Sequence, residues 1–398
     1  MNYDLISLLV FFLILFIIFR IKRNKFEVQG GIFALYRTQL GIKLMDKLAN
    51  KAPRFWKFIG YFGIVIGFIG MAFIFFVLIQ GTIRLITVPS APPAVAPVLP
   101  GVSIPGLPAL SFWHWIIAIF FVAVVHEFSH GVLARANKIK VNSSGFAFLG
   151  PILAAFVEPD EKDLVKKKKQ AQLAVFAAGP LSNIILGFVF VLLAGITFAP
   201  WTVSLTEYSG VQVMSVMDGG AAKEAGLQAK DVILAVNDVE VKNPSDFTKQ
   251  IQKTTPGVPL TLKTERTTLT ITPKAHPNGE SFGYLGIQTQ AIKTGIKESV
   301  KEKYGSFFPK VLLWIGLLIY WLYLINLGVG LFNLLPMGPL DGGRMFLTAC
   351  TAIFKNEKVA KKVFIGVSIF ALALIVINMA PFIWKLLKFI AQPFMLLF

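Results

Sequence analysis

The stretch FWHWIIAIFFVAVVHEFSHGVLA, residues 112–134, decides the fold class of this chain. It contains no lysine, arginine or aspartate, and it exceeds the roughly 20 apolar residues that a helix needs to cross a bilayer. It also carries His126, Glu127 and His130, and ionisable groups at membrane depth are costly enough to indicate a function. The stretch therefore predicts a membrane helix with a functional site.

The composition of the whole chain agrees with a membrane protein. Of 398 residues, 55% are hydrophobic and 15% are charged, whereas soluble globular chains carry roughly 25% charged residues. The apolar content excludes a disordered chain, and the single cysteine excludes a disulfide scaffold. The net charge of +18 indicates lysine-rich cytoplasmic loops rather than a nucleic-acid surface, so we expect membrane lipid and no nucleic acid as a partner.

Hydropathy and charge together predict the topology. Residues 20–57 hold ten Lys/Arg and two acids, and residues 166–169 are four consecutive lysines, so both loops should be cytoplasmic and the N-terminus outside. The first apolar segment has no basic residue before it, unlike a signal peptide, and is expected to be retained. The six predicted spans are residues 5–21, 59–88, 112–134, 173–198, 311–335 and 363–380.

Three connecting segments also have expected structures. Residues 32–48 show apolar residues at helical spacing and predict an amphipathic helix on the inner membrane surface. Residues 89–110 are proline-rich and uncharged, which argues against a helix. Residues 382–398 are expected to form a separate short helix at the membrane interface.

The pattern H-E-x-x-H within residues 126–130 indicates a metal site. Positions i and i+4 of a helix share one face, so His126 and His130 can bind one zinc ion, and Glu127 can take a proton from water. The alternative is a polar pair that bonds between helices.

A catalytic zinc usually has three protein ligands and an open fourth position. His114 lies at the outer end of the same helix and His276 in a polar segment, so neither is expected to reach the metal. Asp341 can reach it if the fifth span packs against the third, because the surrounding prolines and glycines break the helix there. The alternative for Asp341 is a helix cap that faces the cytoplasm.

These motifs resemble the site-2 protease family of zinc metalloproteases, which combines an intramembrane H-E-x-x-H with a later N-x-x-P-x-x-x-L-D-G. Here the second motif runs from Asn333 to Gly342, with Gly338 where many members have proline. The resemblance covers about residues 112–380. It implies one zinc per chain, bound by His126, His130 and Asp341, and Glu127 as the general base.

The same resemblance implies two further site residues. In the Gly-Pro-x-x-Asn element at residues 179–183, Asn183 would hold the scissile carbonyl or its oxyanion. Asn333 would contact the substrate backbone near the metal.

The polar segment between the fourth and fifth spans, residues 201–303, has nearly balanced charge, with 12 Lys/Arg and 11 Asp/Glu. Its motifs A-x-x-A-G-L at 222–227 and D-x-I-x-x-V-N at 231–237 resemble a PDZ domain, with Lys230 in place of the usual glycine. Such a domain resembles a filter for substrates already trimmed outside the cell. A passive spacer is the alternative.

Residues 141–157 are apolar but interrupted by glycine and proline, which favours strands around a turn at Gly150-Pro151. Site-2 proteases have a membrane-entering β-hairpin of this kind, which would pair with an unwound substrate. A loop on the inner membrane interface is the alternative.

We therefore expect a polytopic α-helical membrane protein with about six transmembrane helices, a short membrane-entering β-hairpin and an inserted extracytoplasmic α/β PDZ-like domain. The expected divisions are residues 1–111, 112–199, 200–303 and 304–398. The expected function is hydrolysis of single-pass or multi-pass membrane-protein substrates, pre-cleaved or not, in the cytoplasmic half of a cell membrane. A catalytically inactive scaffold or chaperone for membrane helices, and a metal transporter, are the alternatives.

Overall fold

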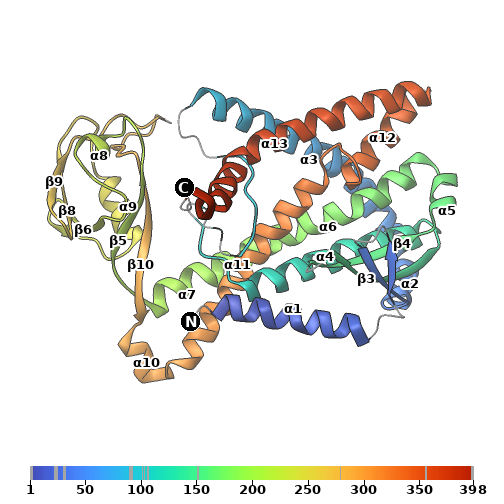
Figure 1. The fold of residues 1–398 in the computed structure, drawn as a ribbon, viewed down its shortest axis with the longest axis horizontal. Coiled ribbons are helices and arrows are strands. Elements are labelled where there is room, and N and C mark those ends of the chain that lie inside the picture. Colours follow the sequence, from blue (N-terminus) through green and yellow to red (C-terminus); the bar gives the residue numbers. More distant parts are fainter. Residues whose placement is uncertain are drawn as a thin grey trace.

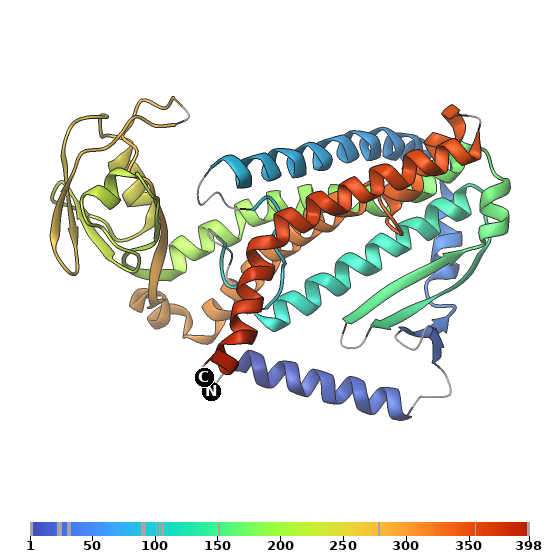
Figure 2. The ribbon, with the colours of Figure 1, turned by 45° about the horizontal axis from the view of Figure 1, so that its top comes forward.

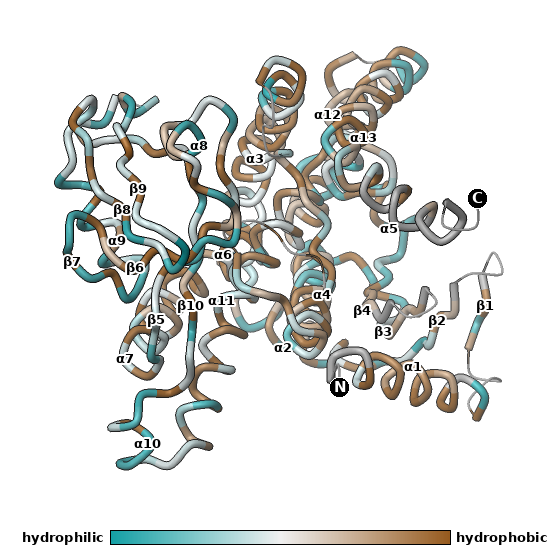
Figure 3. Tube along the Cα trace, turned by 60° about the vertical axis from the view of Figure 1, so that its left-hand side comes forward, coloured by the Kyte–Doolittle hydropathy of each residue, from teal (hydrophilic) through white to brown (hydrophobic). Residues whose placement is uncertain are grey.

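The computed structural model describes residues 3–21, 26–29, 33–88, 93–100, 102, 104, 107–149, 152–277, 279–354 and 356–395. A bundle of long helices forms one part, and a domain built on a sheet is inserted between two of those helices (Figure 1). Hydrophobic residues run along the long helices, whereas the inserted domain is richer in hydrophilic ones (Figure 3).

Five helical segments of the described chain are long and apolar enough to cross a membrane. They lie in α3 (Pro53–Thr87), α4 (Phe112–Ala136), α6 (Lys169–Ile196) with α7 (Phe198–Leu205), α11 (Phe307–Asn333) and α13 (Glu357–Met395). They correspond to five of the six predicted spans.

The first predicted span is the helix α1 (Tyr3–Ile21), whose apolar stretch Ile6–Ile18 is shorter. It packs on α4, where Phe11 meets Phe112 at 5.4 Å between ring centroids and Trp113 Nε1 donates to Ser7 Oγ at 3.0 Å. Whether α1 crosses the membrane remains a prediction.

The C-terminal expectation is wrong. Instead of a span ending at residue 380 and a separate interfacial helix, α13 is one 39-residue helix from Glu357 to Met395. Figure 2 shows that α13 bends. Pro381 lies within it, and a proline inside a helix removes a hydrogen bond and kinks the helix without necessarily ending it.

A second sheet lies beside the helices and confirms the predicted hairpin. Strands β3 (Val141–Leu149) and β4 (Ile152–Pro159) are antiparallel, with Ala147 opposite Ala154. The predicted turn at Gly150-Pro151 lies outside the described residues. Two further strands, β1 (Glu27–Gln29) and β2 (Phe33–Thr38), extend the sheet in the order β1-β2-β3-β4.

Strand β2 corrects the expected amphipathic helix over residues 32–48, of which Ile32 lies outside the described residues. The helix α2 (Ile42–Lys51) begins only after Gly41, whose φ of +80° is left-handed and cannot continue a helix. Residues 33–38 pair with β3 instead. There, a Cβ on Gly145 would lie 2.0 Å from the Tyr36 carbonyl oxygen, so this pairing needs glycine.

Residues 89–110 form no helix where they are described, as expected. The short helix α5 (Glu161–Lys166) connects β4 to α6, and α12 (Asp341–Phe354) connects α11 to α13. The helix α6 contacts α3, α4, α11 and α12, so it forms the centre of the bundle.

The inserted domain has a sheet of order β10-β5-β6-β8-β9, with β7 paired to β6. Its predicted short helix is α8 (Ala221–Glu224), and the next strand is β6 (Val232–Val236). Lys230 has a φ of +76°, which explains why glycine would suit this position. The predicted boundaries near residues 200 and 303 lie within α7 and α10. The remaining elements are β5 (Thr206–Val216), β7 (Val239–Glu240), α9 (Pro244–Ile251), β8 (Leu260–Thr264), β9 (Thr268–Ile271), β10 (Ile287–Ile296) and α10 (Glu298–Tyr304).

Candidate metal centre

Two histidines of α4 form one half of the candidate centre. His126 and His130 lie one helical turn apart, and their ring centroids are 4.8 Å from each other. Both residues are buried, with exposed fractions of 7% and 8%. The predicted helix thus presents both imidazoles on one face.

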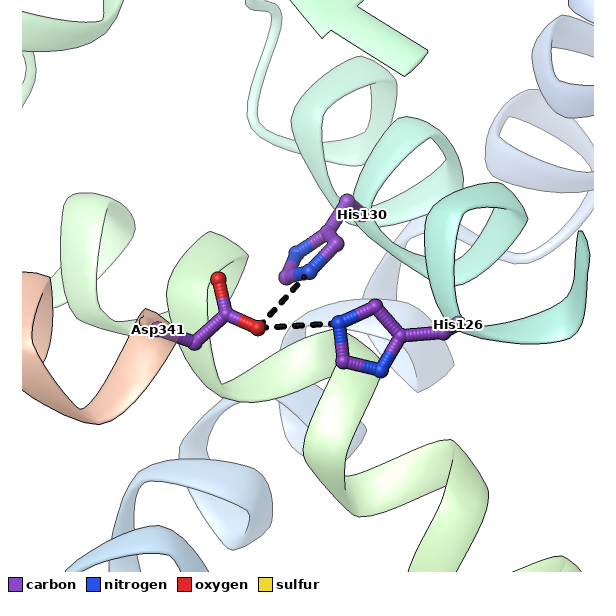
Figure 4. Close-up of side chains that lie close together, drawn as sticks. All are labelled: His126, His130 and Asp341. Atoms are coloured by element: carbon purple, nitrogen blue, oxygen red, sulfur yellow. Dashed lines mark hydrogen bonds and ion pairs between the residues drawn. The ribbon is translucent and has the colours of Figure 1, made fainter. Parts of the chain in front are cut away.

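Asp341 supplies the other half. The helix α11 ends at Asn333, the following turns contain Pro336 and Pro339, and α12 begins at Asp341 itself. The Asp341 Oδ2 atom lies 2.9 Å from His126 Nε2 and 3.2 Å from His130 Nε2 (Figure 4). The structure therefore brings the two histidines of α4 together with an aspartate that lies more than 200 residues later in the sequence.

The donor set fits zinc. Zinc binds histidine nitrogen and carboxylate oxygen at about 2.0–2.2 Å, so tetrahedral ligands lie roughly 3.3 Å apart. The three ligand atoms lie within 4.8 Å of one another, and the distances of 2.9 and 3.2 Å from Asp341 Oδ2 to the two histidine nitrogens are close to that spacing. Among the described residues, His126, His130 and Asp341 form the set of three His, Cys, Asp or Glu side chains whose ligand atoms lie close enough together to hold a metal ion.

Hydrogen-bond contacts to the Nδ1 atoms of the two histidines favour the tautomer whose Nε2 atom can bind a metal. The His130 Nδ1 atom lies 2.7 Å from the Val175 carbonyl oxygen. Because a carbonyl only accepts, Nδ1 carries the proton and Nε2 keeps its lone pair for a metal. The Val175 backbone therefore fixes the tautomer and orientation of His130.

Asn183 is fully buried and contacts the other histidine, with its Nδ2 atom 3.0 Å from His126 Nδ1. When His126 Nε2 binds metal, Nδ1 carries the proton and needs an acceptor. If the Asn183 side-chain amide is flipped by about 180°, Oδ1 can accept the hydrogen bond from His126 Nδ1. In the present orientation Oδ1 has no hydrogen-bond partner in the described chain.

Gly179 leaves the space that the metal centre needs. A Cβ at this position would lie 2.4 Å from His130 Nε2 and 2.5 Å from His126 Nε2. The side-chain-free backbone of α6 thus forms the floor of the site, next to Pro180.

Glu127 points to a different neighbour. Its Oε2 atom accepts a hydrogen bond from the Val157 backbone N–H of β4 at 3.1 Å. Glu127, His130, Asp341 and Val157 all line one cavity of about 470 Å³ between β4 and the helices. The predicted base therefore lines the same cavity as two of the three ligands, His130 and Asp341.

The strand edge at this cavity is tied to the N-terminal segment. Arg37 of β2 forms an ion pair with Glu158 of β4, and its Nη1 atom donates to Ser143 Oγ at 3.0 Å. Arg37 and Glu158 both line the cavity. The sequence analysis missed these residues because it placed Arg37 in a helix.

The structure does not bring every predicted residue to the site. Asn333 donates to the Val329 carbonyl oxygen at 3.1 Å within α11, and it is not among the described residues that line the cavity. As expected, His114 and His276 lie elsewhere. The ring of His114 packs on Trp314, and that of His276 on Phe282.

The sequence profile of Peptidase family M50 matches residues 114–377, which is more than half of the chain. An uncharacterized protein of Methanocaldococcus jannaschii is 32% identical over 366 residues, covering 90% of this chain and 89% of that protein. The probable protease Eep of Enterococcus faecalis is 26% identical over a region that covers 48% of this chain and 53% of Eep. The zinc metalloprotease RasP of Shouchella clausii is 27% identical, covering 57% of this chain and 62% of its own.

A solved PDZ domain of the SdrC-like protein from Listeria monocytogenes is 26% identical over 21% of this chain and 88% of that one, with a TM-score of 0.18. The chain spans about half to two thirds of the length of the two named proteases above. The match to residues 114–377 covers the helix of His126 and His130 and the turn of Asp341. The chain therefore belongs to peptidase family M50, and it is a membrane zinc metalloprotease of the site-2 type.

Proposed function

We propose that this protease hydrolyses peptide bonds within or near the transmembrane segments of single-pass or multi-pass membrane proteins. One observation carries the proposal: Glu127 and two of the three clustered ligands, His130 and Asp341, line a cavity inside the apolar bundle, and the edge strand β4 borders that cavity. Peptide bonds of a membrane helix are shielded by their own hydrogen bonds, so a substrate must unwind before water can attack it.

We propose that β4 receives the unwound segment. It is the last strand of its sheet, and its unpaired edge faces α4 and the cavity. Added strands bind through backbone hydrogen bonds, which would replace those that the substrate helix loses. The Val157 N–H, which now bonds to Glu127, belongs to this edge.

The proposed orientation follows the positive charge. The basic loops at residues 20–57 and 166–169 are cytoplasmic, which puts the N-terminus and the inserted domain outside. His126 and His130 lie in the second half of the inward-running α4. Cleavage would thus occur in the cytoplasmic half of the membrane.

In the proposed mechanism, His126, His130 and Asp341 would hold the zinc, which when bound would supply Lewis-acid chemistry that polarises the carbonyl and acidifies water. Glu127 takes a proton from the attacking water and gives it to the leaving amine. The contact of Asn183 with His126 favours a role in orienting that imidazole over the expected oxyanion role. Contact of Asn333 with the substrate backbone stays a prediction.

We propose that the inserted domain filters substrates at the outer face, so that proteins with bulky external parts are excluded until another protease trims them. This proposal is supported by the short connections of the domain to the bundle: β5 follows α7 directly, and β10 continues through α10 into α11. Whether it binds chain ends or acts by size is part of the same proposal.

The test uses the full chain in vesicles with a co-reconstituted single-pass protein. Glu127→Gln keeps the shape of the side chain but not its basicity, so we expect cleavage to fall by several orders of magnitude while zinc stays bound. Lys47→Gln, an exposed residue of α2 that does not line the cavity, is the control. Undiminished cleavage by Glu127→Gln would remove Glu127 from this role, and no cleavage by the wild type would favour a scaffold.

A further inference from the structure

Two adjoining hollows lie on the other side of α4 and α6 from the Glu127 cavity. The first, of about 330 Å³, lies between α3, α4 and α6, and apart from Ser129 and Ser182 its lining residues are apolar or glycine. The second, of about 200 Å³, lies at the ends of the same helices and is lined by Lys57, Lys167 and Lys168. Neither hollow shares a lining residue with the Glu127 cavity.

The hollows form one continuous surface. Ala174 of α6 lines both, and on α3 the apolar hollow includes Gly60 and the basic hollow includes Tyr61. On α4, the apolar hollow follows Val125, Ser129 and Leu133, and Asn137 at the end of that helix lines the basic one. Along α4 and α6, charge therefore lies at the end of the bundle and apolar surface runs inward from it, whereas on α3 the residues of the two hollows alternate between Phe55 and Gly63.

The dimensions match one lipid chain. The apolar hollow extends along α6 from Ala174 to Leu186, which at 1.5 Å per residue is about 18 Å. One leaflet of the roughly 30 Å hydrocarbon core is about 15 Å thick. A chain that begins at the basic hollow would thus reach the middle of the membrane.

Two of the three lysines that line the basic hollow are available to bind an anion. Lys167 pairs with Asp163 at 3.3 Å and donates to the Lys138 carbonyl oxygen at 2.8 Å. For Lys57 and Lys168, the described residues supply no carboxylate partner, and both are exposed. The polar groups of Asn137 and Gln170 complete the lining.

From these observations we propose that the two hollows bind one anionic phospholipid, with its phosphate at Lys57 and Lys168 and one acyl chain between α3, α4 and α6. Basic pockets between membrane helices bind anionic headgroups, and each lysine near the membrane surface contributes about fivefold in affinity. The lipid would pack behind the two helices that carry His126, His130 and Gly179, outside the peptide-binding cavity.

The test titrates the delipidated full chain in detergent with dioleoyl phosphatidylglycerol or dioleoyl phosphatidylcholine and counts bound lipid by native mass spectrometry. We expect one phosphatidylglycerol per chain, bound at least tenfold more tightly than phosphatidylcholine. Lys57→Gln with Lys168→Gln should weaken phosphatidylglycerol about thirtyfold, and Lys57→Arg with Lys168→Arg should keep it. The matched control is Lys47→Gln with Lys166→Gln, because neither lysine lines the basic hollow.

A second pair of variants tests the apolar half. Ser182→Leu fills the apolar hollow, and its lost hydroxyl bonds only to the Gly179 carbonyl oxygen of the same helix, so we expect weaker binding of phosphatidylglycerol. Val189→Phe adds bulk to the exposed side of α6 and should leave binding unchanged.

Three results would overturn the proposal: equal affinity for the two lipids, equal weakening by the test and control lysine pairs, or glycerol phosphate binding as tightly as the lipid. The second would mean diffuse attraction to the inner surface, and the third a headgroup site without an acyl chain.

Discussion

Replacing Gly179 with alanine should abolish tight zinc binding. The added Cβ would lie 2.4 Å from His130 Nε2 and 2.5 Å from His126 Nε2. A zinc ion bound to these nitrogens lies about 2.0–2.1 Å from each, so the methyl group would occupy the space that the metal needs.

The cost can be judged from these distances. Ordinary carbon contacts begin near 3.4 Å, so each imidazole must retreat by about 1 Å, and the burial of both rings leaves little room for that. Outer contacts alone change metal affinity by about 10- to 100-fold, so displacement of two ligands should exceed 100-fold. Overpacking would cost about 1–3 kcal/mol of folding stability in addition.

The assay is competition for zinc between the purified full chain and a chelator of known affinity. Gly195→Ala is the matched control, because it lies on the same helix and its Cβ would meet no atom within 4 Å. Gly195 lies in the last turn of α6 and does not have a left-handed backbone conformation, so alanine fits there and the control should fold as well as the wild type. If Gly179→Ala bound zinc as tightly as Gly195→Ala, the metal would not lie between His126 and His130 above α6.

Two further predictions concern a positioning residue and the inserted domain. Asn183→Ala should weaken zinc binding about 10- to 100-fold, because His126 Nδ1 would lose its contact with the Asn183 amide. Asn183→Asp should restore much of the zinc affinity, because a carboxylate can accept a hydrogen bond from Nδ1. Unchanged zinc affinity with slower cleavage would instead favour the oxyanion role. In the inserted domain, the Arg266 side chain and the Gln228 backbone N–H bond to Asp231 and lower the pKa of its carboxyl from the usual 3.8. Because the folded-state pKa is lowered, this stabilisation is complete above about pH 4 and is lost as the pH falls through the folded-state pKa. Asp231→Asn should therefore destabilise the domain by about 1–2 kcal/mol at pH 7 and progressively less below pH 4. The measurement is hydrogen exchange of residues 206–296 in the full chain. A stability difference between variant and wild type that does not change with pH would show that the charge of Asp231 is not the cause.

The metal ligands could be predicted because their signals are local or scarce. The spacing of His126 and His130 places both rings on one helix face whatever surrounds them. Asp341 followed from elimination, since few ionisable residues remain inside the membrane and the prolines near it break the helix. The long apolar helices followed from hydropathy in the same way.

The parts that were missed depend on tertiary contacts. Residues 33–38 are apolar enough to continue a helical pattern, and only pairing with β3 across Gly145 makes them a strand. The hydrogen bonds from the Val175 carbonyl and the Val157 N–H have no sequence signal, because every residue carries such groups. The predicted end of the last span at residue 380 is wrong because α13 continues through Pro381 to Met395.

Zinc content per chain, measured by elemental analysis of the wild type, His126→Ala and Asp341→Ala, tests the central claim most directly. We expect one zinc in the wild type and its loss, or much weaker binding, in both variants, because α4 and the start of α12 contribute ligand atoms 2.9 Å apart. Full zinc occupancy in Asp341→Ala would place the third ligand elsewhere. A wild type that holds no zinc after reconstitution would contradict the metal centre itself.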